Sequence, residues 1–211
     1  MFEWFKRENS FRPLKEIPEG HKIYRVHQLS RATLGAGDLR KAVKLPPNEN
    51  ENDWLANGVV DFYCTLNSLF SLICEKCSEE RCPEMKAGAG FQYFWQDKQL
   101  KKVLSLPAKQ YIGNVLDWIF AEMNNETKFP SNPDTPFPKN FRELIEKIFQ
   151  RMFRIYAHIY INHHEDIIIA GGESHMNTTL KHFVFFITEF NLIPAAQLAP
   201  LKNVIDQILN D

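Results

Sequence analysis

The sequence predicts an all-α protein, a helical bundle with long irregular segments between its helices. Apolar residues recur at helical spacing over 54–74, 108–126 and 139–164. A fourth segment, 177–193, begins with the capping signal Asn177/Thr178. Four prolines within 127–141 mark an irregular loop. One stretch, 92–107, is expected to form a short β-hairpin.

The first part of the chain divides into an arm and the start of the folded domain. Residues 1–30 mix charges, Pro13, Pro18 and Gly20 without periodicity, so we expect a partly irregular N-terminal arm before a domain spanning 31–211. One or two helical turns are expected after Asp38, ending at Pro46, and Asp53 is expected to cap the helix that starts at Trp54.

The segment 139–164 is predicted to be the central helix. Its apolar stripe is followed by flanking aromatic residues, so more than half of its circumference is apolar. The stripe consists of Phe141, Ile145, Ile148, Met152, Ile155 and Ile159. Residues 195–210 close the chain.

Composition narrows the class of protein. The 211 residues, 44% of them hydrophobic, supply a sizeable core, and the net charge of −1 argues against general binding to nucleic acid or anionic lipid. We expect neither an export signal nor membrane insertion, because no apolar run approaches the roughly 20 residues of a span. The charge is segregated, with net +5 over 1–45 and net −5 over 46–82.

Cysteine and histidine pairs suggest a metal site. Cys77 and Cys82 form a Cys-x4-Cys pair in a charged loop, and His158 and His163 form a His-x4-His pair, spacings that zinc sites use. Cys74 and His164 compete for these roles. Positions five apart on an ideal helix point about 140° apart, so the helix must distort or end near Asn162 for both imidazoles to share one ion. Four protein ligands would make the site closed and structural.

Signals for catalysis are weak. The stretch His164-Glu165-Asp166 does not continue into a His-Glu-x-x-His motif, and there is no phosphate-binding glycine loop or nucleophile elbow, so we expect no enzyme. Lys147, Arg151 and Arg154 lie on the polar face of the central helix, where they either bind phosphate or form a solvated face.

Several longer stretches carry a family resemblance. "LPPNENENDWLANGVVDFY", "CSEERCPEM", "TPFPKNF", "MFRIYAHIYI" and "HMNTTLKHFVFFITEFNLI" together closely resemble the Mob (Mps one binder) family of kinase activators. The similarity runs from about residue 11 to the C-terminus. It implies a four-helix core stapled by one structural Zn²⁺, with ligands at Cys77, Cys82, His158 and His163, and no catalytic activity.

The resemblance also implies partners. Family members bind the basic N-terminal regulatory region of NDR/LATS-type AGC kinases in Hippo and mitotic exit signalling, through positions that match Glu49, Asp53, Asp61 and His182. The alternative is a Mob-like scaffold in a phosphatase or trafficking assembly that activates no kinase. The expected location is cytoplasmic, with the nucleus, cell cortex and spindle poles as further candidates.

A second set of positions concerns phosphorylation. Some members bind phosphothreonine peptides of upstream Ste20-type kinases through three basic residues on the long helix. Two match Arg151 and Arg154, the first is Gln150 here, and Lys147 one turn back is a candidate substitute. Thr33 matches a threonine that is phosphorylated in some members.

Overall fold

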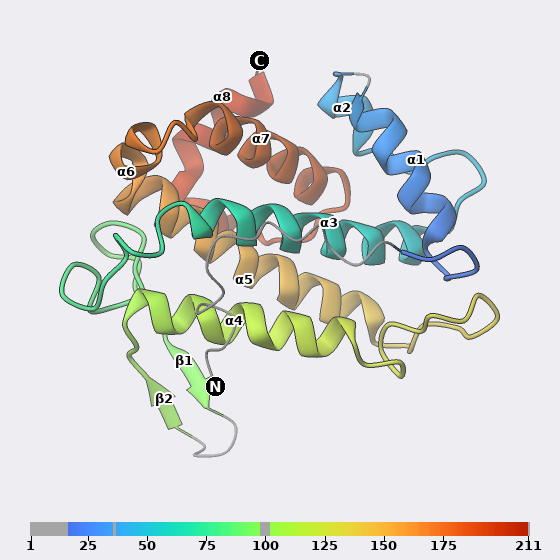
Figure 1. The fold of residues 1–211 in the computed structure, drawn as a ribbon, viewed down its shortest axis with the longest axis horizontal. Helices are drawn as coiled ribbons and strands as arrows, with labels where there is room; N and C mark the ends of the chain where they lie inside the picture. The colour runs from blue at the N-terminus through green and yellow to red at the C-terminus, as the bar shows by residue number, and fades with distance from the viewer. Residues whose placement is uncertain (1–16, 36, 98–101, 211) are drawn as a thin grey trace.

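A computed structural model describes residues 17–35, 37–97 and 102–210. Figure 1 shows the predicted all-α architecture with one small hairpin. The helices are α1 (Tyr24–Gly35), α2 (Leu39–Ala42), α3 (Glu51–Ser71), α4 (Ala108–Met123), α5 (Phe141–Asn162), α6 (His164–Ile169), α7 (Glu173–Glu189) and α8 (Lys202–Asn210), with a 3-10 helix over Ala195–Leu201 before α8.

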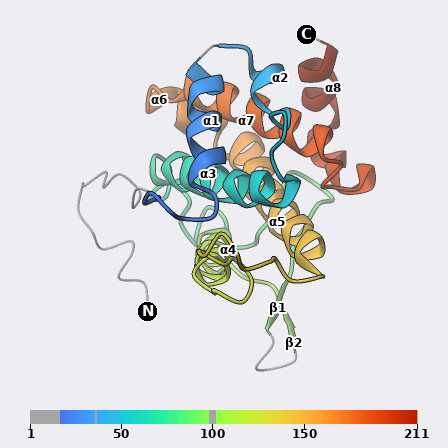
Figure 2. The ribbon, with the colours of Figure 1, turned by 90° about the vertical axis from the view of Figure 1, so that its right-hand side faces the viewer.

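The four-helix centre consists of α3, α4, α5 and α7. Helix α3 packs against the other three, and α5 packs against α3 and α4. Figure 2 shows α1 and α2 covering the side of this centre that is formed by α3 and α7. The six residues of the predicted stripe on α5 are all buried, so the prediction of a central helix is confirmed.

Helices α3 and α7 approach each other closely at Gly58. A Cβ atom placed on this glycine would lie 2.4 Å from Cζ of Phe186, a distance that packed side chains do not tolerate. The Phe186 ring lies among Phe62, Phe149 and Phe190, with centroid distances of 5.2, 5.3 and 4.9 Å. An aromatic cluster thus sets the spacing between the two helices.

The N-terminal part is more regular than the sequence indicates. Helix α1 begins at Tyr24, inside the stretch that was expected to be an irregular arm, and Ile23 and Val26 enter the core. Only a few large apolar residues of α1 face inward, so the helical period is weak in the sequence. The expected arm also covers residues 1–16, which lie outside the described residues.

Helix ends differ from the expected ones by a few residues. Asn50, not Asp53, caps α3, because its side chain accepts a hydrogen bond of 2.8 Å from the backbone N–H of Asn52. Helix α7 starts at Glu173, so Asn177 lies inside it rather than at its cap. The short helix α6 was not expected.

The hairpin consists of β1 (Trp95–Asp97) and β2 (Lys102–Leu104). The strands are antiparallel, and Trp95 pairs with Leu104. The expected hairpin is therefore present, although its tip, 98–101, lies outside the described residues. Among the described helices, none combines the length and the apolar character that crossing a membrane requires.

Candidate metal centre and binding surfaces

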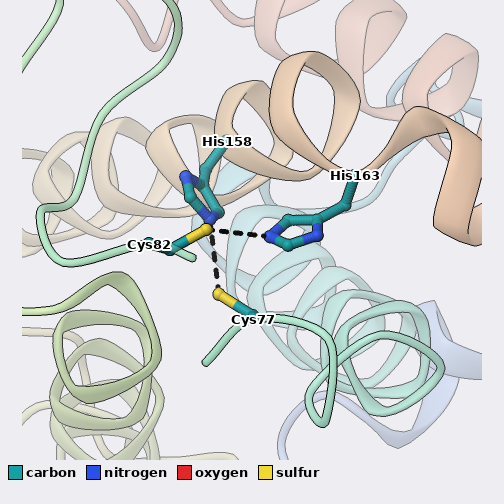
Figure 3. Close-up of side chains that lie close together, drawn as sticks. All are labelled: Cys77, Cys82, His158 and His163. Carbon is teal, nitrogen blue, oxygen red and sulfur yellow. Dashed lines mark hydrogen bonds between the residues drawn. The ribbon is translucent and has the colours of Figure 1, made fainter. Parts of the chain in front are cut away.

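Four buried side chains from two distant parts of the chain meet at one end of α5. They are Cys77, Cys82, His158 and His163, and their ligand atoms all lie within 4.8 Å of one another. Figure 3 shows the two imidazoles facing the two thiols, with Sγ of Cys77 3.4 Å from Nε2 of His158 and Sγ of Cys82 3.4 Å from Nε2 of His163.

The end of α5 makes this convergence possible. On a continuous helix the two histidines would diverge by about 140°. Helix α5 instead ends at Asn162, and His163 adopts φ −131° and ψ 18° before α6 begins. The helix therefore ends where the sequence required it to end, and the ring of His163 turns toward that of His158, with centroids 5.1 Å apart.

Both imidazoles are oriented by groups behind them. Nδ1 of His158 lies 2.7 Å from the carbonyl oxygen of Lys86, and Nδ1 of His163 lies 2.8 Å from the carboxylate of Asp166. Both partners are acceptors, so each Nδ1 donates its hydrogen and each Nε2 lone pair faces the thiols. Metal-binding histidines commonly show this arrangement.

Burial keeps the four groups uncharged when no cation is present. It raises the pKa of the Cys77 and Cys82 thiols. It lowers the pKa of His158 to about 4, and it lowers the pKa of His163 against the opposing hydrogen bond to Asp166. A divalent cation would balance two thiolates, and two sulfur and two nitrogen donors suit Zn²⁺. These four residues could therefore hold a metal ion.

The two competing residues lie outside this cluster. The thiol of Cys74 lies 3.5 Å from the carbonyl oxygen of Ser71, to which it donates, in a half-buried position. His164 packs its ring against Tyr160, with centroids 5.3 Å apart. The structure thus distinguishes between alternatives that spacing alone left open.

The acidic residues proposed for kinase binding lie along α3 and just before it, next to α1. Glu49 forms an ion pair of 2.7 Å with Nε of Arg25. Asp61 accepts hydrogen bonds from Ser30 (3.1 Å) and Asn57 (2.8 Å). These contacts leave the acids half-buried rather than freely exposed.

Asp53 and His182 are the remaining two residues of this set. Oδ1 of Asp53 is buried, and no hydrogen-bond donor among the described residues reaches it. Burial and the nearby Glu49 raise the pKa of Asp53, against the attraction of Lys22. His182 is on α7, and its ring centroid lies 4.7 Å from that of Phe62, the residue after Asp61, with the two rings tilted by 43°. Burial lowers the pKa of His182 to about 4.

Arg151 and Arg154 of α5 are held by aromatic side chains that sequence reasoning missed. The Arg151 guanidinium lies over Trp118 and Trp95, 4.5 and 5.0 Å from the ring centroids. Arg154 donates a hydrogen bond of 2.9 Å to the Tyr111 hydroxyl. Trp95 lies in the segment expected to form the hairpin, and Tyr111 and Trp118 lie in the predicted helix 108–126, but nothing in the sequence indicated that these segments meet α5.

The other two positions considered for phosphate binding are Lys147 and Gln150. Lys147 is exposed, one turn before Arg151. The side-chain oxygen of Gln150 accepts a hydrogen bond of 3.4 Å from Gln197, at the 3-10 helix. Burial lowers the pKa of Arg151, yet the guanidinium remains charged at neutral pH.

Thr33, the candidate phosphorylation site, lies in the last turns of α1. Its hydroxyl donates to the backbone carbonyl oxygens of Leu29 and Ser30, both at 3.0 Å. This back-bonding is usual for a threonine inside a helix, and the side chain is half-buried.

Comparison with known proteins identifies the family. The profile of the Mob1/phocein family matches residues 31–201. The chain is 42% identical to MOB kinase activator-like 1 homolog A of Dictyostelium discoideum, over 98% of this chain and 97% of that protein. It is 44% identical to MOB kinase activator 3B of Mus musculus, over 95% and 94%, and 43% identical to MOB kinase activator-like 1A of Medicago sativa subsp. falcata, over 97% and 95%. With a family profile over most of its length and relatives above 40% identity end to end, the chain belongs to the Mob1/phocein family.

Proposed function

We propose that this protein is a non-catalytic adaptor that binds and activates a protein kinase. The relatives carry the name of kinase activators, not of kinases, and they match the chain over nearly its whole length. The partner we propose is the basic N-terminal regulatory region of an NDR/LATS-type AGC kinase. The observation that carries this choice is the row of half-buried acids at α3, in a segment of net charge −5.

The docking surface would work by charge complementarity. Asp53 has a buried carboxylate oxygen that lacks a donor, and a partner Lys or Arg could supply one. Glu49 already pairs with Arg25 of α1, so a cation of the partner has to replace that contact. Ordering of the kinase segment on this surface would bias the kinase toward its active arrangement.

The proposed metal is one structural Zn²⁺ held by Cys77, Cys82, His158 and His163. The donor set fits because all four side chains are buried, both Nε2 atoms face the thiols and the two thiolates neutralise the cation. Four protein ligands leave no position for an activated water, so the ion would hold the cysteine loop against α5 and supply no chemistry.

The decisive experiment measures binding to a recombinant N-terminal regulatory region of an NDR/LATS-type kinase by titration calorimetry. Asp53→Lys should weaken binding at least about tenfold, or about 1.4 kcal/mol, because it places a like charge opposite the basic partner. Glu80→Lys, at an exposed acid in the cysteine loop, changes charge equally and should leave the affinity within about twofold.

Arg25→Gln provides a second test, in which the affinity should change in the opposite direction. It removes the cation that pairs with Glu49, so binding should become tighter. Asp61 is a poorer target, because its carboxylate also holds α1 through Ser30. Equal affinity of the wild type, Asp53→Lys and Arg25→Gln would reject this surface. If native capture recovered a phosphatase assembly and no kinase, the scaffold alternative would replace the kinase adaptor.

We propose in addition that Arg151 and Arg154 bind a phosphothreonine peptide of an upstream Ste20-type kinase. Aromatic contacts hold both guanidinium groups in place, which lowers the entropic cost of gripping a phosphate. Gln150 offers no charge at a position where the family resemblance implies a basic residue in some members. Each charge-assisted hydrogen bond contributes about 1.5–3 kcal/mol. Gln150→Lys should therefore raise affinity for a phosphothreonine peptide about tenfold or more, without raising affinity for the unphosphorylated peptide. An equal gain for both peptides would argue against a phosphate site.

A further inference from the structure

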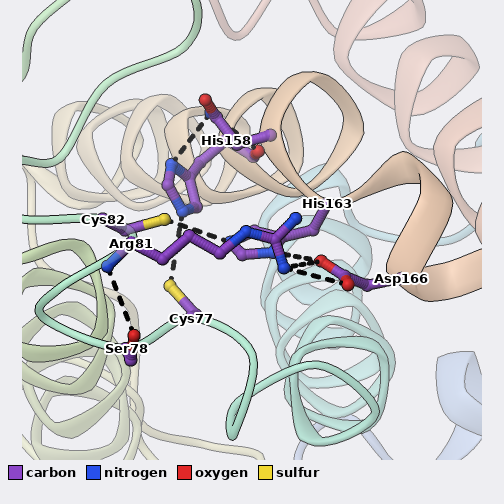
Figure 4. Close-up of polar contacts among 8 residues, drawn as sticks. Cys77, Ser78, Arg81, Cys82, His158, His163 and Asp166 are labelled. Carbon is purple, nitrogen blue, oxygen red and sulfur yellow. Dashed lines mark hydrogen bonds and ion pairs between the residues drawn. The ribbon is translucent and has the colours of Figure 1, made fainter.

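The cysteine loop (residues 77–82) contacts α6, the helix that follows α5, at a second point beside the candidate metal ligands. Nη1 of Arg81, the residue before Cys82, lies 2.9 and 2.7 Å from the two carboxylate oxygens of Asp166. The same carboxylate accepts the hydrogen bond from Nδ1 of His163 at 2.8 Å. Figure 4 shows the resulting chain of contacts from Arg81 through Asp166 to His163.

We propose that Asp166 is the positioning residue for the metal ligand His163, and that Arg81 positions Asp166 in turn. This inference rests on the proposed zinc site. It assigns to two side chains outside the ligand set a share in the affinity for the metal.

The first argument concerns the tautomer and the direction of the imidazole. His163 is held by a side chain on a following helix, whereas His158 is held by the backbone carbonyl of Lys86. His163 joins α5 to α6, and its backbone is held there because its N–H donates to the carbonyl oxygen of Ile159 (2.9 Å) and its carbonyl oxygen accepts from the N–H of Ile167 (3.0 Å). The direction of its ring is then set by the contact of Nδ1 with Asp166. Without the carboxylate, the tautomer that carries its proton on Nδ1 would be less favoured. Nε2 would then be protonated more often, and its lone pair would be directed less well at the ion.

The second argument concerns charge. Two thiolates and a divalent cation sum to zero, so Asp166 adds one uncompensated negative charge next to the site. The Asp166 side chain is only 10% exposed, which makes an unpaired carboxylate costly there. Arg81 compensates this charge from a position that is 46% exposed. Asp166 can thus stay ionised and accept from His163 without disturbing the balance at the metal.

The third argument concerns the backbone that carries Arg81. The N–H of Arg81 donates to Oγ of Ser78 (3.3 Å), and the N–H of Cys82 donates to the carbonyl oxygen of Ser78 (2.8 Å). This turn places the guanidinium and the Cys82 thiol next to each other. The ion pair and the metal therefore join the same loop to the same helix junction. Once one of these links has formed, the groups that make the other are already close to their final positions.

Competition between the full-length protein and a chromophoric chelator for Zn²⁺ tests the inference. Asp166→Asn should weaken Zn²⁺ affinity about 10- to 100-fold, the usual effect of losing an outer-shell partner. The matched control is Glu165→Gln, which removes the same charge from the exposed neighbouring position of α6 and should change affinity less than about twofold.

Arg81 is tested through coupling. Arg81→Gln should weaken binding less than Asp166→Asn, with an effect that shrinks at high salt, because the guanidinium is half exposed. If Arg81 acts through Asp166, the double variant should bind Zn²⁺ within about twofold of Asp166→Asn alone. The control for the loop is Lys76→Gln, at an exposed cation one residue before Cys77.

A spectroscopic readout separates positioning from a loss of fold. In the Co²⁺-substituted protein, Asp166→Asn should shift the ligand-field bands, because the His163 ring changes its direction, while Glu165→Gln should not. Asp166→Glu should recover part of the affinity. Asp166→Asn with the affinity and spectrum of Glu165→Gln overturns this inference alone, and so do strictly additive effects of Arg81 and Asp166. Wild-type protein that binds no metal overturns the zinc proposal itself.

Discussion

Substitution of Gly58 by alanine tests the close approach of α3 and α7. The new methyl group would lie 2.4 Å from Cζ and 2.9 Å from Cε1 of Phe186, well inside van der Waals contact. The ring has no room to retreat, because Phe62, Phe149 and Phe190 surround it and it is only 3% exposed. Relief therefore requires that the helices separate or that the ring leave its rotamer.

The magnitude follows from two opposed effects. Alanine in place of glycine inside a helix stabilises by about 1 kcal/mol. Overpacking of a filled core costs about 1–3 kcal/mol, and a contact this short belongs at or above the upper end of that range. We expect a net loss of about 2 kcal/mol in the free energy of unfolding.

Urea denaturation of zinc-loaded protein measures this loss as a lower midpoint with an unchanged slope. Gly172→Ala is the matched control. Its Cβ would meet Cδ1 of Leu72 at 2.9 Å, but Leu72 is 38% exposed and can swing away, so the cost should stay below about 1 kcal/mol. Phe186→Leu should relieve part of the Gly58→Ala penalty in the double variant. If Gly58→Ala were as stable as the wild type, the reasoning from the packed ring would be wrong.

Two further predictions concern the metal and pH. Removal of the proposed Zn²⁺ by a strong chelator should lower the melting temperature. It should also speed amide exchange in the segment where Met85, Ala87 and Tyr93 donate backbone hydrogen bonds, while amides in the middle of α3 stay protected. Unchanged exchange at Met85, Ala87 and Tyr93 would contradict a role for the ion in holding the loop. The pKa of His182 is lowered to about 4 by burial, so the unfolded chain takes up its proton first as the pH falls below about 6.5, and stability is lost on acidification. Between pH 7 and pH 5 this amounts to about 2 kcal/mol, which His182→Gln should remove from the pH dependence of urea unfolding; an identical pH dependence in both proteins would contradict it.

Periodic apolar spacing was enough to predict most of the fold. The stripe of α5 is buried along its whole length, since a helix packed on several sides must be apolar around most of its circumference. Helix α1 was missed because its buried side is narrow. Its position depends on contacts with α3, such as the hydrogen bond from Ser30 to Asp61, and a single sequence does not display contacts across 31 positions.

The candidate metal cluster was predictable in part for a different reason. Cys-x4-Cys and His-x4-His spacings are visible in a sequence, but the exclusion of Cys74 and His164 depends on where two helices end. Cys74 falls just past the last turn of α3, and His164 starts α6 with its ring toward Tyr160. The aromatic supports of Arg151 and the Arg81–Asp166 pair are likewise products of tertiary structure, invisible to local patterns.

The two proposed functional regions differ in how their charges are satisfied, and this difference bears on their roles. At the candidate metal centre every described acceptor and donor around the histidines is matched, from the carbonyl of Lys86 to Arg81, which suits a site that never changes its partners. At the acidic surface Asp53 keeps an oxygen without a donor, and Glu49 is paired through an Arg25 side chain that is 76% exposed. Exposed ion pairs contribute little to stability and exchange readily, whereas a buried carboxylate oxygen without a donor is costly until a cation arrives. An adaptor is expected to combine two such regions: a candidate metal centre whose histidines already have their partners among the described residues, and a surface whose remaining contacts are made by the protein that binds it.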